Sequence, residues 1–148
     1  MSQEISTAVG STLRESIDHL QAEVLKLEQP QFETEHYWAG GMYCRVLPRQ
    51  AGTVIIGKTH RQEHFYLVLS GTVLITNGDK APIEVTGPKV IVSQPGTRRA
   101  VYAKTDAVCA TVHRTSETDL ERLDAELCEP APESTYLPGN ALKRLRLL

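Results

Sequence analysis

The chain has 148 residues, enough for one domain with a single core, and 16 Lys and Arg residues against 18 Asp and Glu residues give it a formal net charge of −2. A balance so close to neutral provides no general basic surface for nucleic acid or for an anionic membrane. The N-terminus lacks a basic region followed by an apolar run, and no stretch approaches the roughly 18 apolar residues of a membrane span, so we expect a cytoplasmic protein that binds neither nucleic acid nor membrane.

Residues 1–30 are predicted to form an N-terminal helical arm. Apolar residues at alternating spacings of four and three make one stripe on a helix, namely Leu13, Ile17, Leu20, Val24 and Leu27. Ser11 is a candidate N-cap, and Pro30 ends the helix. Two interpretations stay open. The helix packs on its own barrel or a neighbour's, which we favour because two heptads are marginal alone, or it pairs as a parallel coiled coil.

Residues 31–114 are predicted to form a β-barrel. Short β-branched runs are separated by turn residues in MYCRVL, GTVIIG, HFYLVLSGTVLIT, KVIVS and AVCATVH. About eight strands at this spacing are typical of a sandwich or barrel. Asn77-Gly78 predicts a hairpin, because both residues tolerate the positive φ of a tight turn. The aromatic stretch HYW at 36–38 is expected to precede the first strand and to close one end of the barrel.

Residues 115–148 are predicted to form an acidic helix and a tail. Leu120, Leu123 and Leu127 in SETDLERLDAEL follow a helical period, and Ser116 and Asp119 have the spacing of a capping box. The last segment, ALKRLRLL, is short, basic and apolar. We expect it to dock either on the acidic helix or on a partner, with the first the favoured interpretation.

The three cysteines are Cys44, Cys109 and Cys128, and no two of them form a C-x-x-C pair. An odd number at wide spacing is more typical of buried thiols in a reducing compartment than of a disulfide framework. We therefore predict free thiols.

The spacing of glycines and histidines in the middle of the chain resembles the first motif of the cupin superfamily, G-x5-H-x-H-x3-4-E-x6-G. The spacings of that motif are reproduced by Gly52, Lys58, His60, His64 and Gly71. Two residue types differ, because Lys58 stands in place of the first histidine and His64 in place of the glutamate. Glycines at fixed spacing mark turns and so fix the lengths of the strands between them.

The segment GPKVIVSQPGTRRAVYA resembles the second cupin motif, G-x5-P-x-G-x2-H-x3-N. Gly87 comes one residue early, Gln94 takes the place of the proline, Gly96 is retained, Arg99 stands where histidine is expected, and Ala103 replaces the final asparagine. The two resemblances together imply a mainly β fold: a cupin-type double-stranded β-helix, or small jelly-roll barrel, with an N-terminal helix and a short C-terminal helix.

In metal-binding cupins, four positions supply two histidines, a glutamate and a third histidine, and the resemblance places these on Lys58, His60, His64 and Arg99. Lysine must lose a proton to bind a metal, and arginine has no lone pair to offer. A divalent ion about 4 Å from one ammonium is repelled by roughly 8 kcal/mol at an effective dielectric of about 20. We therefore expect no metal and no other cofactor. The alternative is a divalent transition metal such as Zn, Fe or Mn on His60 and His64, with a third ligand from the following: His36, Cys44, Glu63 or His113.

Cationic side chains around one pocket require a negative partner. Strand alternation places Tyr66 on the face of His60 and His64, and Arg99 suits bidentate contact with an acid. We therefore expect Lys58, His60, His64, Tyr66 and Arg99 to bind a small anionic molecule (a carboxylate, phosphate or sugar derivative) in a homo-oligomer. A structural alternative makes the histidines wall residues and lets Lys58 and Arg99 form salt bridges to acids such as Glu63 or Asp79, or to a neighbouring subunit.

Two other functions stay open. The first is a non-catalytic assembly protein, supported by the heptad stripe, the basic C-terminal segment, and a weaker resemblance to cupin-like proteins of tailed phages, which carry a similar acidic helix after the barrel. The second is an enzyme, either metal-dependent or resembling the cupin epimerases and isomerases, with His60 or His64 as the base. No acidic partner for such a base is evident in the sequence, so the balance favours a protein without catalytic activity.

Overall fold

The computed structural model describes residues 17, 19, 20, 22, 23, 33–78 and 80–131. The expectations for Ser11, for Pro30, for most of the apolar stripe and for the segment ALKRLRLL lie outside these residues. Within them, no helix is long and apolar enough to cross a membrane.

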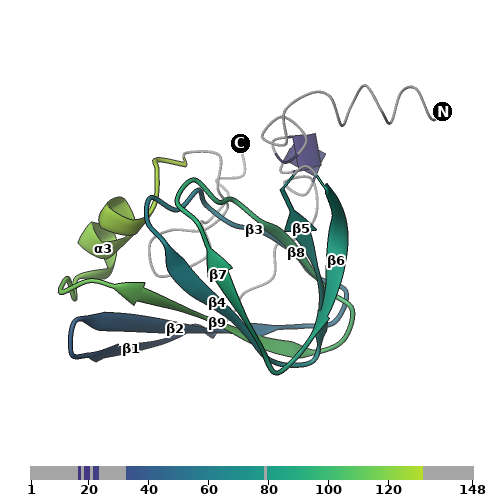
Figure 1. Ribbon diagram of the computed structural model, residues 1–148, viewed down its shortest axis with the longest axis horizontal. Coiled ribbons are helices and arrows are strands. Elements are labelled where there is room, and N and C mark those ends of the chain that lie inside the picture. The colour runs from purple at the N-terminus through teal and green to yellow at the C-terminus, as the bar shows by residue number, and fades with distance from the viewer. Residues whose placement is uncertain (1–16, 18, 21, 24–32, 79, 132–148) are drawn as a thin grey trace, which may run out of the picture.

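In the described residues from 33 onward, nine strands form two packed layers, and one helix follows the last strand (Figure 1). They are β1 (Glu35–Ala39), β2 (Met42–Arg49), β3 (Val54–Ile56), β4 (His64–Ser70), β5 (Thr72–Asn77), β6 (Lys80–Thr86), β7 (Lys89–Ser93), β8 (Ala100–Ala103), β9 (Ala107–Arg114) and α3 (Leu120–Leu127). One sheet has the order β1-β2-β9-β4-β7 and the other β3-β8-β5-β6, and all the pairings are antiparallel. The mainly β, two-sheet barrel predicted from the sequence is confirmed.

Glycines allow the tight connections between these strands. Gly78 has φ +60 in the β5–β6 hairpin, where Asn77 pairs with Lys80, so the predicted turn is confirmed. Gly71 joins β4 to β5 with φ +80, and a Cβ there would overlap the backbone carbonyl oxygen of Asp106. Gly52 also has a positive φ, of +85, but a Cβ on it would meet open space. Gly71 is therefore required on two counts and Gly52 on one.

Two local predictions were wrong. The aromatic stretch at 36–38 lies inside β1, which pairs with β2 across a turn of two positive-φ glycines, Gly40 and Gly41. The helix α3 is capped by Asp119 and not by Ser116. Asp119 has extended backbone, and its carboxylate accepts from the amides of Glu121 and Arg122, so the helix begins three residues later than a cap at Ser116 would place it.

The core lies between the sheets and continues beneath α3. Val68, Val73, Ile75 and Cys109 are among the buried residues of the main cluster. A second cluster joins α3 to β2 and consists of Tyr43, Leu123, Leu127 and Cys128. The three cysteines are free, as predicted, and Cys44 is only partly buried.

The described residues of the N-terminal helix include one that is buried. Ile17 is 3% exposed and packs with Ile56 and Ala100 of the barrel, whereas Leu20 is 36% exposed. The favoured interpretation was that the helix packs on its own barrel or on a neighbour's, and the contact of Ile17 agrees with the first of these.

Candidate functional site

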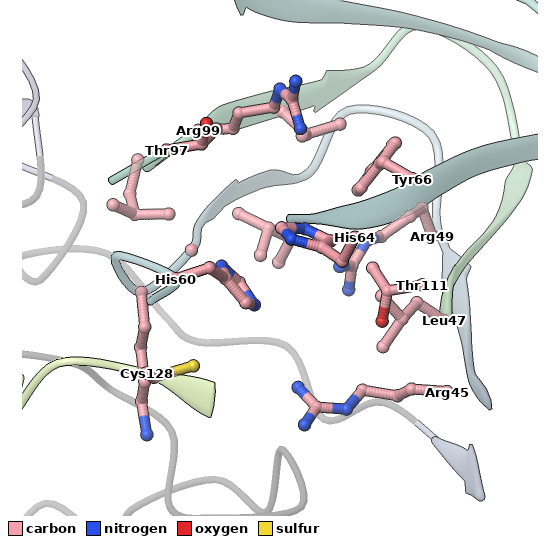
Figure 2. Close-up of a pocket in the computed structure, with 15 residues that line it drawn as sticks. Arg45, Leu47, Arg49, His60, His64, Tyr66, Thr97, Arg99, Thr111 and Cys128 are labelled. Carbon is pink, nitrogen blue, oxygen red and sulfur yellow. The ribbon is translucent and has the colours of Figure 1, made fainter. Parts of the chain in front are cut away.

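A cavity of about 90 Å³ lies between the two sheets, beside the C-terminal end of α3 (Figure 2). Its wall consists of Arg45, Leu47, Arg49, Ile55, Ile56, Gly57, Lys58, His60, His64, Tyr66, Thr97, Arg99, Val101, Thr111 and Cys128. The five side chains predicted to bind a ligand all lie in this wall, so the fold brings them together. That they bind a ligand stays a prediction.

Two arginines of the wall were missed by the sequence analysis. Arg45 and Arg49 of β2 are 7% and 8% exposed. Every second residue of β2 from Tyr43 to Arg49 is buried, which includes Leu47. Because every second side chain of a strand points to the same face, all four of these side chains point inward. The sequence contained one signal for the inward orientation of these arginines, which was the strand period of two. Because they lie outside the two motifs, that period alone gave no reason to place charged side chains inside the barrel.

In the described part of the chain, the partners of Arg45 and Arg99 are all neutral groups. Arg45 Nε donates to the Tyr43 hydroxyl at 2.9 Å, and its guanidinium carbon lies 5.4 Å from the centre of that ring. Arg99 donates to the hydroxyl of Ser93 and lies 5.6 Å from the centre of the Tyr66 ring. Burial lowers the pKa of Arg99, which remains a cation because guanidinium is so weak an acid. Neither charge has a carboxylate beside it among these residues.

Lys58, in contrast, is paired. Its Nζ lies 3.0 Å from Asp124 Oδ2 of α3, and the two side chains are 16% and 18% exposed. Backbone bonds from Arg61 N to Leu127 O and from Glu129 N to Thr59 O, at 2.7 and 2.9 Å, hold the end of α3 against the same segment. The partner of Lys58 is therefore neither of the acids named from the sequence. The cations of the wall with neutral partners are Arg45 and Arg99.

Three histidine rings pack together next to the cavity. The ring centres of His60 and His64 are 4.4 Å apart, those of His64 and His113 4.6 Å, and those of His60 and His113 5.4 Å. His64 Nδ1 donates to the Gln62 carbonyl at 3.1 Å. His113, on β9, is 1% exposed, and neither of its ring nitrogens has a hydrogen-bond partner in the described part of the chain.

These histidines are neutral at pH 7. Burial, reinforced by His64, lowers the pKa of His60 to about 3. Burial, reinforced by His60 and His64, lowers the pKa of His113 to about 2. The pKa of His64 is lowered as well, mainly by burial. The imidazoles therefore add hydrogen-bonding capacity to the wall but no charge.

The residues at the metal positions implied by the cupin resemblance do not fit a metal ion. Lys58 is engaged by Asp124, and Arg99 offers no lone pair. His113 stacks on His60 and His64, with interplanar angles of 7° and 26°. Within the described ranges, no three His, Cys, Asp or Glu side chains are placed so that they could hold a metal ion.

Two hydroxyl groups complete the polar part of the wall. Thr111 Oγ1 is buried without a hydrogen-bond partner among the described residues, and the side chain lines the cavity. Burial raises the pKa of Tyr66, so its phenol stays protonated and is a donor. Figure 2 shows Arg99 on one side of the space and Arg45 on the other, with His60, His64 and Arg49 between them.

Comparisons with known proteins identify structural neighbours only. No family model and no curated protein matches the chain. A cupin superfamily protein from Desulfitobacterium hafniense is 14% identical, with a TM-score of 0.51, over 64% of this chain and 87% of that one. An uncharacterised protein with a double-stranded β-helix domain from Klebsiella pneumoniae is 12% identical, with a TM-score of 0.52, over 67% and 90%. The DMSP lyase DddQ from Ruegeria pomeroyi is 15% identical, with a TM-score of 0.51, over 60% of this chain and half of that one. At such identities the likeness concerns the fold alone.

Proposed function

This chain has the cupin fold that its motif spacing predicted, and we propose that its barrel mouth binds a small anionic molecule without a metal ion. The observation that carries the proposal is the composition of the cavity wall. Arg45, Arg49 and Arg99 line it, and no Asp or Glu does so among the described residues. A carboxylate, a phosphate or an acidic sugar derivative is the complement of such a wall.

The physical argument concerns the cost of burying charge. A cation removed from water is stabilised only by an opposite charge or by several hydrogen bonds. Arg45 has one hydroxyl and one aromatic face, and Arg99 has the same two kinds of partner. An acidic ligand supplies the missing negative charge, and each guanidinium is able to hold it through two parallel hydrogen bonds. Neutral His60 and the buried hydroxyl of Thr111 add polar contacts.

The size of the cavity limits the ligand. About 90 Å³ is room for roughly six water molecules, or for one inorganic phosphate or a short carboxylic acid. A larger sugar derivative would place only its acidic group inside and extend into solvent. We therefore expect the tightest contacts to be made by the acidic group itself.

The test is a calorimetric titration of the metal-free full chain with inorganic phosphate, acetate and succinate. Arg45→Met and Arg99→Met keep much of the side-chain volume and remove the charge, so each should weaken the best of these ligands at least about tenfold. Arg122→Met is the matched control, because Arg122 is exposed on α3 and does not line the cavity. Equal affinities in all three variants, or no binding by the wild-type protein, would refute the proposal.

A metal-dependent function is the second candidate, and one observation favours it. His60, His64 and His113 lie within ring contact, and both nitrogens of the buried His113 lack partners in the described part of the chain. The rings would have to turn out of their stack for three nitrogens to reach one ion. Elemental analysis of the protein as purified, before any chelator, tests this candidate. A stoichiometric transition metal that is lost in His113→Leu would establish it and would end the metal-free proposal.

A further inference from the structure

The floor of the cavity is formed by a row of three buried side chains that crosses three neighbouring strands. Thr111 of β9 pairs with Arg45 of β2 on one side and with Tyr66 of β4 on the other. Paired side chains point to the same face of a sheet, and all three of these line the cavity. Because neighbouring strands lie about 4.8 Å apart, the two ends of the row are about 10 Å apart at the backbone.

Each end of this row carries one arginine. At the β2 end the guanidinium is that of Arg45 itself, which donates to the hydroxyl of Tyr43. At the β4 end the guanidinium of Arg99 lies 5.6 Å from the centre of the Tyr66 ring and donates to the hydroxyl of Ser93. Figure 2 shows the two arginines on opposite sides of the space. Their contacts with neutral partners therefore hold the two cations apart, one at each end of the row.

The charges of both arginines act on the space between them. Burial lowers the pKa of His64, and the charges of Arg99 and Arg45 lower it further. The hydroxyl of Thr111 lies in the middle of the row and has no hydrogen-bond partner among the described residues. Arg49 adds a third cation between the two ends (Figure 2). A ligand with a single negative charge would therefore leave one end of the row without an opposite charge.

The other sheet contributes apolar side chains to the cavity. Ile55 of β3 and Val101 of β8 are paired, buried and part of the wall. Leu47 adds a third apolar side chain, two residues beyond Arg45 on the same face of β2. An apolar wall across from a polar row favours a ligand that has methylene groups between its acidic groups.

We propose that the anion bound by this cavity is a short dicarboxylate, with one carboxylate on Arg45, the other on Arg99, and its methylene groups against Ile55 and Val101. The inference rests on the proposed function and narrows it to one class of ligand. Each guanidinium is able to hold a carboxylate through two parallel, charge-assisted hydrogen bonds. Acetate or inorganic phosphate is too compact to contact both ends of the row, and so leaves one buried cation unmatched.

Calorimetric titration of the metal-free full chain at constant ionic strength tests the proposal. The ligands are malonate, succinate and glutarate, the monomethyl ester of each, acetate and inorganic phosphate. Each ester keeps the length of its diacid and lacks one charge. The diacid that binds most tightly should bind at least about tenfold more tightly than its own ester, because one charged contact is lost. This comparison uses only the wild-type protein and does not depend on the folding of any variant.

Two variants locate the two carboxylates. Arg45→Met and Arg99→Met should each lower the affinity for that diacid at least about tenfold and change the affinity for its ester by no more than about threefold, so that the two ligands bind about equally. Arg122→Met, at an exposed position of α3 outside the cavity wall, should keep the wild-type preference.

The possible outcomes separate this inference from the proposed function. Equal binding of a diacid and its ester by the wild-type protein, or binding of acetate or phosphate as tightly as any diacid, would overturn the inference and leave the proposed function standing. A preference for the diacid that survives in either arginine variant would do the same. Binding of no acid at all would refute the proposed function and this inference with it.

Discussion

The buried histidine cluster makes the protein sensitive to acid, and the effect can be isolated at His113. The folded state holds His113 neutral with a pKa of about 2, whereas an unfolded chain titrates histidine near its ordinary value of roughly 6.5. Between these values the unfolded state binds the extra proton, so the stability contributed by His113 is complete above about pH 6.5 and falls as the pH falls. At about 1.4 kcal/mol per pH unit, acidification from about pH 7 to about pH 5 costs roughly 2 kcal/mol for this residue.

His60 acts in the same direction, because its pKa of about 3 is also lowered. The two residues together should cost about 4 kcal/mol over the same interval, a large part of the stability of an ordinary domain. Urea unfolding of metal-free protein, with chelator present and at constant ionic strength, measures the free energy at each pH. His113→Leu should lose about 2 kcal/mol less than the wild-type protein on acidification, whatever its stability at pH 7. His19→Leu, at an exposed position, should follow the wild-type profile. Parallel profiles for wild type and His113→Leu would refute the reasoning.

Three further predictions concern stability and are checked by the same unfolding assay. Asp124→Asn leaves the half-buried Lys58 without its partner and should cost about 2 kcal/mol, more than Lys58→Met, which removes the cation itself; equal costs would mean that the cation tolerates burial. Gly71→Ala combines a left-handed backbone with overlap on a carbonyl oxygen and should cost at least about 3 kcal/mol, against about 1 kcal/mol for Gly52→Ala, which has the backbone conformation only; similar values would show that the loop at Gly71 can move. Leu123→Ala removes a fully buried side chain beneath α3 and should lower the free energy of unfolding by about 2–5 kcal/mol. A decrease below about 1 kcal/mol would mean that the buried face of α3 does not hold the helix on the barrel.

The fold was predictable because the turns between its strands are encoded by local sequence. Gly71 and the Asn77-Gly78 pair are fixed by backbone conformations that few other residues adopt, so their spacing sets the strand lengths directly. The strand β1 escaped prediction because its residues are largely exposed and its pairing with β2 depends on the turn at Gly40 and Gly41. The N-cap was predicted at Ser116 because serine and aspartate are both favoured N-cap residues. The backbone conformation shows that the cap is Asp119.

The site was only partly predictable, because its electrostatics depend on long-range contacts. The sequence placed Lys58, His60, His64, Tyr66 and Arg99 in one wall, where the structure brings them together. It gave no means of pairing Lys58 with Asp124, which is 66 residues away. It also left the histidines as titrating groups, since the depth of burial that keeps them neutral is a property of the packed barrel.

The arginines of β2 show the same limit. Their inward orientation follows from strand alternation, but a charged residue facing a barrel interior becomes plausible only once the cavity beside it is known.

The most direct test of the cationic mouth is a crystal structure of the protein soaked in sodium selenate, whose selenium scatters anomalously and whose charge and shape resemble those of phosphate. An anomalous peak inside the cavity, in contact with Arg45, Arg49 or Arg99, is the predicted result. Peaks confined to the outer surface, a mouth filled by the protein's own side chains, or an ion held by His60, His64 and His113 would contradict it.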